Sequence, residues 1–171
     1  PAVGDITGDG DLEIVVLTFD GGIFVIESDG TFAEGFPQRT DLERSMGTTN
    51  KENLVDHGFF SSPVLADLDE DGNLEIITAA MDQHIYVWRH DGSKQPGWPL
   101  RVRDPKKDER TDRIMCTPAV GDVNGDGLLD IVTGTNETFG ASGSENESRA
   151  YVIHGDGLNH EGGPFHEGWP I

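Results

Sequence analysis

One acidic motif of nine residues occurs three times in the chain, and it constrains the fold more than any other feature. It occupies residues 5–13, 67–75 and 122–130 and reads D-x-[DNT]-x-D-G-x-L-[DE] each time. Side chains with oxygen atoms stand at positions 1, 3, 5 and 9, a glycine at position 6 permits a sharp turn, and position 7 can offer a backbone carbonyl. Because calcium takes six to eight oxygen ligands, the motif predicts one calcium ion in each loop.

The predicted calcium ligands are the residues at these five positions of each copy. They are Asp5, Thr7, Asp9, Asp11 and Glu13 in the first loop, Asp67, Asp69, Asp71, Asn73 and Glu75 in the second, and Asp122, Asn124, Asp126, Leu128 and Asp130 in the third. Up to three calcium ions are therefore expected as cofactors.

The residues around the motif distinguish it from an EF-hand. An EF-hand carries a bidentate Glu at position 12 of its loop and lies between two helices. Position 12 is Val16, Thr78 and Thr133 in the three copies. The EF-hand interpretation is therefore excluded.

Both flanks of each motif predict β-strands. The stretch after the motif is rich in β-branched residues and has no helical period, whereas the stretch before it is short, apolar and opened by a proline. The preceding stretches are residues 1–4, 63–66 and 118–121, and the following ones are residues 12–17, 74–78 and 129–133. Each loop is therefore expected to close a β-hairpin.

The similarity between the copies continues beyond the hairpin. A third, alternating stretch ends in Asp-Gly, and each copy then closes on Gly-aromatic-Pro at Gly35, Gly97 and Gly168. The motif recurs after 62 and then 55 residues. Four short strands in each repeat are typical of a propeller blade, so the sequence predicts an all-β fold of β-propeller blades, each with four antiparallel strands.

The repeats divide the chain into three expected blades of one propeller domain, each with a long insertion. The blades are residues 1–61, 62–116 and 117–171, and the insertions are residues 40–61, 101–116 and 134–147. Since propellers usually have four to eight blades, three blades form an incomplete ring. The remainder of the propeller, from the same chain or from other chains, is therefore an expected partner.

These residues resemble the FG-GAP repeat, which is found in the β-propeller head of integrin α subunits and in many bacterial surface and secreted proteins. The resemblance covers most of the chain outside the insertions, although the literal Gly-Ala-Pro tripeptide is missing. It implies that the loop between the first two strands of each blade binds calcium. The implied ligands are the residues at positions 1, 3, 5 and 9 of the three motifs.

Composition limits the possible partners. The formal net charge is −20, with 12 Lys and Arg against 32 Asp and Glu, so nucleic-acid binding is excluded. No apolar run approaches the roughly 18 residues of a membrane helix, so no transmembrane segment is expected. Cys116 is the single cysteine and gives no information on the compartment. Modular calcium sites usually work at extracellular calcium levels, which predicts an extracellular or cell-surface location.

The insertions are expected on the face opposite the calcium loops, because each joins strands at the other end of the blade. Long loops on one face of a rigid scaffold often bind partners, and a protein or carbohydrate ligand is expected there. The candidate contacts are Phe59 and Phe60 with His57, and the basic stretch of residues 101–113. The alternative is that the insertions are disordered or only cover the ring.

Three other groups of residues are expected to stabilise the fold and not to form a catalytic or metal site. The pair Asp56 and His57 lacks a nucleophile or third partner. Trp88, Trp98 and Trp169 are expected to pack within blades. His154, His160 and His166 are spaced by six residues, too far for one helix face, so a transition-metal site is disfavoured.

Two functional classes remain open. A non-catalytic binding, adhesion or scaffold module is favoured, because the repeated chemistry concerns metal binding and no set of acid, base and nucleophile is visible. The alternative is the propeller portion of a secreted enzyme such as a polysaccharide lyase, since a fold alone does not define a function.

Overall fold

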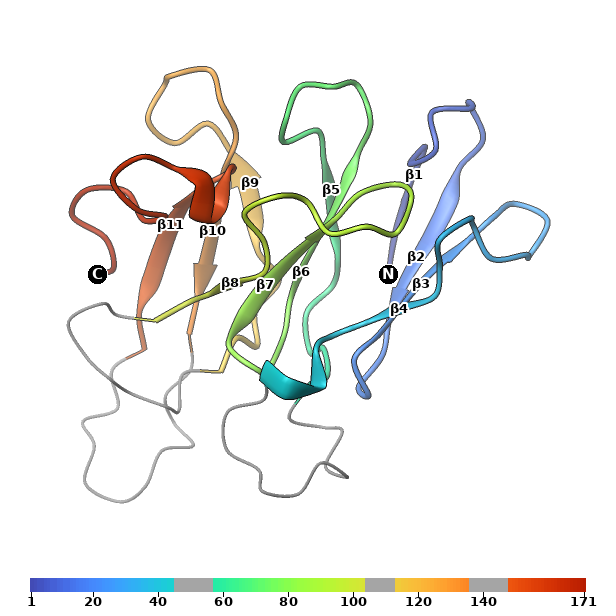
Figure 1. The fold of residues 1–171 in the computed structure, drawn as a ribbon, viewed down its shortest axis with the longest axis horizontal. Helices are drawn as coiled ribbons and strands as arrows, with labels where there is room; N and C mark the ends of the chain where they lie inside the picture. Colours follow the sequence, from blue (N-terminus) through green and yellow to red (C-terminus); the bar gives the residue numbers. More distant parts are fainter. Residues whose placement is uncertain (45–56, 104–112, 136–147) are drawn as a thin grey trace.

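The computed structural model describes residues 1–44, 57–103, 113–135 and 148–171, which form three antiparallel β-sheets side by side in an open arc (Figure 1). The described residues contain no α-helix, and their helical turns are of the 3-10 type, among them η1 (Leu42–Arg44) and η3 (Gly157–Asn159). The predicted all-β class and the incomplete ring are therefore confirmed. The exact blade boundaries stay a prediction.

Each repeat forms one sheet whose strands follow the chain order. The first sheet contains β1 (Ala2–Gly4), β2 (Glu13–Leu17), β3 (Gly22–Ile26) and β4 (Gln38–Arg39). The second contains β5 (Val64–Ala66), β6 (Glu75–Ala79), β7 (His84–Trp88) and β8 (Leu100–Arg101). The third contains β9 (Ala119–Gly121), β10 (Asp130–Gly134) and β11 (Ala150–His154).

The third sheet has three strands among the described residues, and a single residue continues it. The backbone N–H of Ala150 donates to the carbonyl of Ile171 at 2.9 Å, and the N–H of Ile171 donates to the carbonyl of Ala150 at 3.1 Å. Ile171 follows the Gly-aromatic-Pro tripeptide, as β4 and β8 do in the other sheets. It therefore takes the place of the fourth strand.

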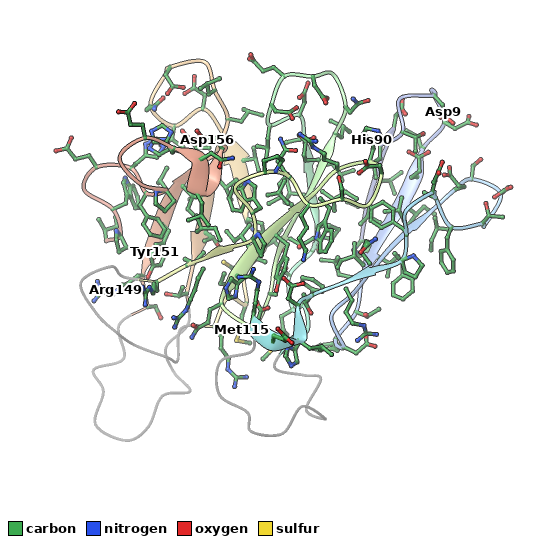
Figure 2. The ribbon with its side chains drawn as sticks, viewed as in Figure 1. Asp9, His90, Met115, Arg149, Tyr151 and Asp156 are labelled. Carbon is green, nitrogen blue, oxygen red and sulfur yellow. The ribbon has the colours of Figure 1, made fainter. Side chains whose placement is uncertain are left out.

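The predicted hairpins are present in all three sheets. The inner strands β1, β5 and β9 each begin directly after a proline, and β1 and β9 both contact β5. The acidic loops connect β1 to β2, β5 to β6 and β9 to β10, and all three lie on the same edge of the molecule (Figure 1). Figure 2 places Asp9 at this edge and Met115 near the opposite one.

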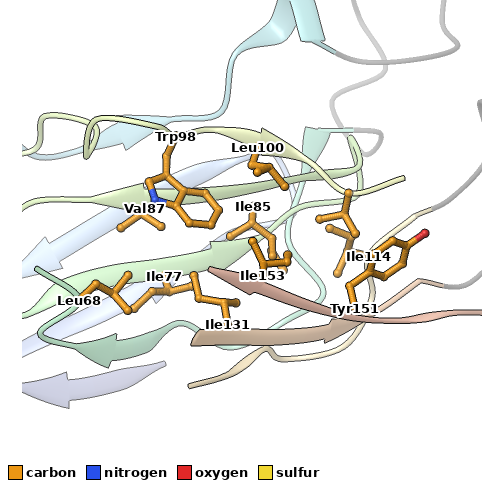
Figure 3. Close-up of a cluster of buried hydrophobic side chains, with 12 residues drawn as sticks. Leu68, Ile77, Ile85, Val87, Trp98, Leu100, Ile114, Ile131, Tyr151 and Ile153 are labelled. Carbon is orange, nitrogen blue, oxygen red and sulfur yellow. The ribbon is translucent and has the colours of Figure 1, made fainter. Parts of the chain in front are cut away.

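The core consists of two layers, one on each side of the second sheet. Strands β6 and β7 are buried along their whole length. Their alternate side chains face opposite ways, so Ile76 and Trp88 pack toward the first sheet, while Ile77 and Val87 pack toward the third (Figure 3). This two-sided burial explains the continuous apolar run in the second repeat. The expected packing role of Trp88 and Trp98 is confirmed, since both are buried in these layers.

Glycine lets neighbouring sheets approach closely. Gly35 has φ +82°, and a Cβ on it would lie 1.9 Å from the carbonyl oxygen of Asp91 in the next sheet. Gly97 has φ +92°, and a Cβ there would lie 2.3 Å from the carbonyl oxygen of Asp156. Gly35 and Gly97 are therefore required because each meets the Asp-Gly turn of the following blade.

The first sheet exposes apolar side chains on the face that points away from the second sheet. Val3, Ile14 and Phe32 are 59%, 41% and 54% exposed. Val3 pairs with Ile14 across the sheet, and Ile14 pairs with Ile26. In the second sheet, the equivalents of Val3, Ile14 and Ile26 are Leu65, Ile76 and Trp88, which pack against the first sheet. One face of the first sheet is thus built like an interface between blades.

The described ends of the insertions lie at the edge opposite the acidic loops (Figure 1). The prediction that His57 and Phe59 form an exposed binding surface is wrong, because they are only 1% and 4% exposed and Phe59 packs between the first two sheets. Phe60 is 47% exposed, and its ring packs edge to face on Phe19 with 4.7 Å between centroids. Asp56 and the middle of the basic stretch, with Lys106, Lys107 and Arg110, lie outside the described residues.

Candidate metal centre

The three acidic loops share one backbone conformation, which the aspartate at position 1 holds. Asp5 accepts N–H groups from Gly8 and Gly10 at 2.8 and 3.1 Å. Asp67 and Asp122 likewise accept the N–H of the glycine at position 6, and each accepts a second N–H from its own loop. The glycine at position 6 has φ between +92° and +95° in all three loops, a conformation that favours glycine. The loops are therefore wrapped around the carboxylate at position 1.

The carboxylate at position 9 is buried in every copy and ties the start of the loop to the next strand. Glu13 Oε2 accepts the N–H of Ile6 at 2.7 Å, and Glu75 Oε2 accepts that of Leu68 at 2.8 Å. Asp130 Oδ2 accepts the N–H of Val123 at 3.1 Å. One oxygen of each position-9 carboxylate therefore accepts a backbone hydrogen bond, and the other oxygen can bind a further partner.

The first loop contains two buried oxygen atoms without a hydrogen-bond partner in the described part of the chain. They are Oγ1 of Thr7 and Oε1 of Glu13, the side-chain atoms at positions 3 and 9. A buried polar atom without a partner costs about 1–3 kcal/mol. Both atoms are predicted calcium ligands, so an oxygen-seeking cation in this loop would satisfy them. The residues present therefore fit calcium.

The second loop carries the highest density of negative charge. One carboxylate oxygen from each of Asp67, Asp69 and Asp71 lies within 4.8 Å of the other two. Burial, together with the charges of these aspartates, raises the pKa of Glu75 to about 7. Three carboxylates this close repel one another unless a cation lies between them, so this loop also fits calcium.

Two side chains from outside the second loop contact Asp69. The Nε2 group of Gln95 donates to Asp69 Oδ2 at 2.6 Å, and the Nη2 group of Arg89 lies 3.5 Å from the same oxygen. Arg89 also donates to the Oε1 of Gln95. Arg89 therefore offsets part of the negative charge of the second loop, and the motif alone does not predict this contact.

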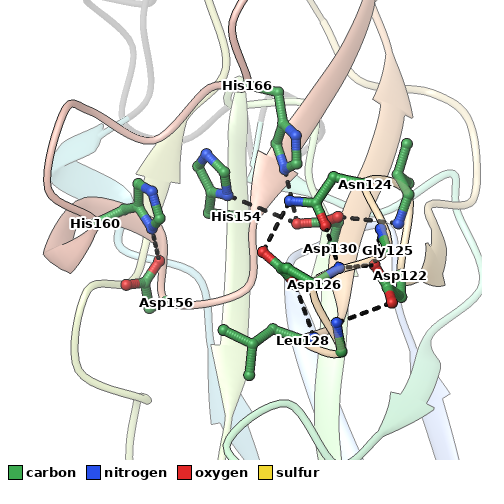
Figure 4. Close-up of polar contacts among 12 residues, drawn as sticks. Asp122, Asn124, Gly125, Asp126, Leu128, Asp130, His154, Asp156, His160 and His166 are labelled. Carbon is green, nitrogen blue, oxygen red and sulfur yellow. Dashed lines mark hydrogen bonds and ion pairs between the residues drawn. The ribbon is translucent and has the colours of Figure 1, made fainter.

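The third loop differs at positions 3 and 9 (Figure 4). Asn124 donates from Nδ2 to Asp126 at 2.8 Å. The second oxygen of Asp130 faces two histidines, with His166 Nε2 at 2.7 Å and His154 Nδ1 at 3.7 Å. Burial lowers the pKa of His154, and the neighbouring His166 and His160 lower it further.

The remaining predicted ligands lie on the exposed side of the loops. At position 7, the backbone N–H of Asp11, Asn73 and Leu128 donates to the position-5 aspartate of the same loop at 2.8–2.9 Å. Asp9 and Asp11 are exposed at the tip of the first loop. Calcium binding by the five positions stays a prediction for all three copies.

His154 and His166 lie together although six-residue spacing was expected to keep such histidines apart. A helix was the wrong reference, because His154 ends β11 and His166 lies in the loop that follows it. The repeat alignment contains the useful signal. His154 and His166 occupy the positions of Arg89 and Gln95 in the second repeat, next to the loop.

Comparison with protein families identifies the repeats. The FG-GAP-like repeat model matches residues 5–78 and 67–133, and the FG-GAP repeat model matches residues 117–153. A comparison with curated proteins gave no match. None of the helices in the described residues is long and apolar enough to span a membrane. Because the matched residues cover most of the sequence, this chain belongs to the FG-GAP repeat family.

Proposed function

We propose that this chain is a calcium-stabilised part of an extracellular β-propeller that acts as a non-catalytic binding or adhesion module. The observation that carries the proposal is the pair of buried, unpartnered oxygens of Thr7 and Glu13 at two ligand positions of one loop. The clustered carboxylates of the second loop support it independently. Calcium would neutralise the negative charge of the loops and fix the turn between the first and second strands of each blade.

The exposed face of the first sheet supports a first partner, which is the rest of the propeller. Val3 and Ile14 expose apolar surface where the equivalent residues of the second sheet, Leu65 and Ile76, are packed. An exposed apolar sheet face of this kind marks an interface. A further blade of the same type fits it, because the second sheet covers the other face of the first in that way.

The ligand surface is proposed on the edge opposite the calcium loops, with a protein or a carbohydrate as ligand. Phe19 and Phe60 form an exposed aromatic pair there, and Arg103 in the second insertion is also exposed. Aromatic and Arg side chains dominate binding energies at interfaces. Phe19→Ser with Phe60→Ser should abolish binding to glycan or matrix-protein panels without changing Tm. Unchanged binding would move the ligand surface elsewhere.

Thermal unfolding with calcium and with chelator tests the role of calcium. At a free calcium concentration of 100 times Kd, each site stabilises the fold by about 2.7 kcal/mol, so Tm should rise clearly with calcium. Asp67→Ala should remove part of this rise, whereas the control Glu34→Ala, at an exposed acidic residue outside the loops, should keep all of it. A Tm that does not respond to calcium would refute the proposal.

The calcium affinity tests the proposed location. Extracellular calcium modules bind with a Kd of about 10⁻⁴–10⁻³ M, and calorimetry should place these sites in that range. A submicromolar Kd would instead suit an intracellular calcium buffer and would contradict the extracellular assignment.

A further inference from the structure

The third blade holds a cluster of nitrogen and oxygen ligands next to its acidic loop. Asp130 is the first residue of β10 and is registered directly opposite His154, the last residue of β11. The backbone N–H of His166 donates to the carbonyl of Val152 at 3.1 Å, which fixes His166 beside the same strand. The sheet register and one loop contact therefore bring the three side chains together (Figure 4).

The distances within this cluster suit a small metal ion. His166 Nε2 lies 2.7 Å from Asp130 Oδ1, and His154 Nδ1 lies 3.7 Å from the same oxygen. All three ligand atoms lie within 4.8 Å of one another. Ligand atoms about 2.0–2.2 Å from a tetrahedral Zn²⁺ are roughly 3.3–3.6 Å apart, so small side-chain rotations would place all three around one ion.

The cluster is sheltered on one side and open on the other. The side chains of Asp130, His166 and His154 are only 3%, 11% and 16% exposed. A cavity of about 250 Å³ borders the cluster, and its lining includes Asp126, Asp130, His154, Asp156 and His160. A metal ion held by three protein ligands at such a place would keep a coordination position for water or an external ligand.

The imidazole rings form a stack that orders the ligands. The ring centroid of His154 lies 3.8 Å from that of His166 and 3.5 Å from that of His160. His160 Nδ1 is in turn 3.1 Å from Asp156 Oδ1. His160, held by Asp156, thus packs against His154 on the side away from His166 and limits the rotation of that ring.

The blade fold does not require these histidines. In the second blade the residues equivalent to His154 and His166 are Arg89 and Gln95, which contact the position-3 aspartate of their own loop. In the first blade the residue equivalent to His166 is Ala33, whose N–H makes the same backbone bond to Val25. The histidine pair is therefore specific to the third blade and is free to serve a separate purpose.

We propose that Asp130, His154 and His166 form a transition-metal site of the zinc type, which shares Asp130 with the third acidic loop and opens to the neighbouring cavity. Two imidazoles and one carboxylate suit Zn²⁺, whereas calcium prefers oxygen ligands alone. Asp130 links the two kinds of site. Its Oδ2 supports the third acidic loop, and its Oδ1 belongs to the histidine site.

Calorimetric titration of Zn²⁺ into calcium-saturated protein tests this site, because excess calcium occupies the acidic loops. One Zn²⁺ should bind to the wild-type protein. His166→Gln and His154→Arg introduce the residues that the second blade carries at these places, and each should weaken Zn²⁺ binding at least tenfold. His90→Gln, a matched control at a histidine of the second blade outside the cluster, should bind Zn²⁺ as the wild type does.

Two further measurements keep the result interpretable. Both variants should retain the calcium-dependent rise in Tm. If His154→Arg fails to fold, His166→Ala is used in its place, because the first blade has Ala33 at the position of His166. Co²⁺ bound to the wild type should give the strong visible absorption of a tetrahedral site, and His166→Gln should lose it. The proposal is overturned if the wild type binds no Zn²⁺, or if the variants bind it with unchanged affinity.

Discussion

The second and third blades share one motif but surround it differently. In the second blade, three carboxylates of the loop gather together, and Arg89 and Gln95 reach over to Asp69. In the third blade, an asparagine replaces the middle carboxylate, and two histidines face Asp130 instead. The motif therefore determines the turn, while the two residues beside it determine which side chains face the loop carboxylates in each blade.

The two blades also differ in packing. Ile77 in β6 lies between the second and third sheets and is completely buried. The equivalent residue of the third blade is Val132, which is only partly buried on the outer face of β10. The second blade thus stabilises both of its neighbours, whereas the third has a packed sheet on one side among the described residues.

The largest expected effect concerns this packing. Ile77→Ala should lower the free energy of unfolding by about 2–5 kcal/mol, because it opens a cavity between two sheets. Val132→Ala should cost only about 1 kcal/mol, because water already reaches that side chain. Urea denaturation of both variants in saturating calcium measures the difference. Equal losses would show that the outer face of the third blade is also covered in solution.

The next effect concerns loop charge. Asp71→Asn and Asp126→Asn should each remove up to about 2.7 kcal/mol of calcium stabilisation, measured at 100 times the wild-type Kd. In chelator the two variants should differ, because Asp71→Asn relieves repulsion among three carboxylates and should raise Tm, whereas Asp126 has a neutral amide beside it. If Asp71→Asn also lowers Tm in chelator, repulsion in the second loop is unimportant.

The strands and turns were predictable from sequence because their causes are local. A proline at the strand start, β-branched residues in the strand and a glycine at position 6 act within one hairpin. The observed strands begin and end within two residues of the expected stretches around each motif. Local chemistry was sufficient here because the repeat presents the same pattern three times.

The neighbours of the loops were not predictable in the same way. Asp130 and His166 are 36 residues apart, and only the register of β10 with β11 and the following loop brings them into contact. Phe59 was expected at the surface because it lies in an insertion, yet it fills the space between two sheets. Phe19, which forms the exposed aromatic pair with Phe60, lies in a turn that carries no distinctive motif.

The smallest expected effect concerns pH and the second loop. Burial and the surrounding aspartates raise the pKa of Glu75 to about 7, so folded, calcium-free protein retains this proton longer than the unfolded chain does. Calcium-free stability should therefore fall as the pH rises from about 4.5 to about 7. Calcium favours the ionised carboxylate, so its binding should release this proton near pH 6.5.

Calorimetry in buffers of different ionisation enthalpy measures that proton release. The affinity of the second loop should improve up to about tenfold between pH 6 and pH 8, since one pKa unit corresponds to a tenfold change. Glu75→Gln keeps an oxygen for the N–H of Leu68 but cannot release a proton, so it should abolish this part of the release. If Glu75→Gln releases as many protons as the wild type, the pH response of calcium binding comes from the other loops. Glu75 would then not be the source of the electrostatic difference between the second and third blades.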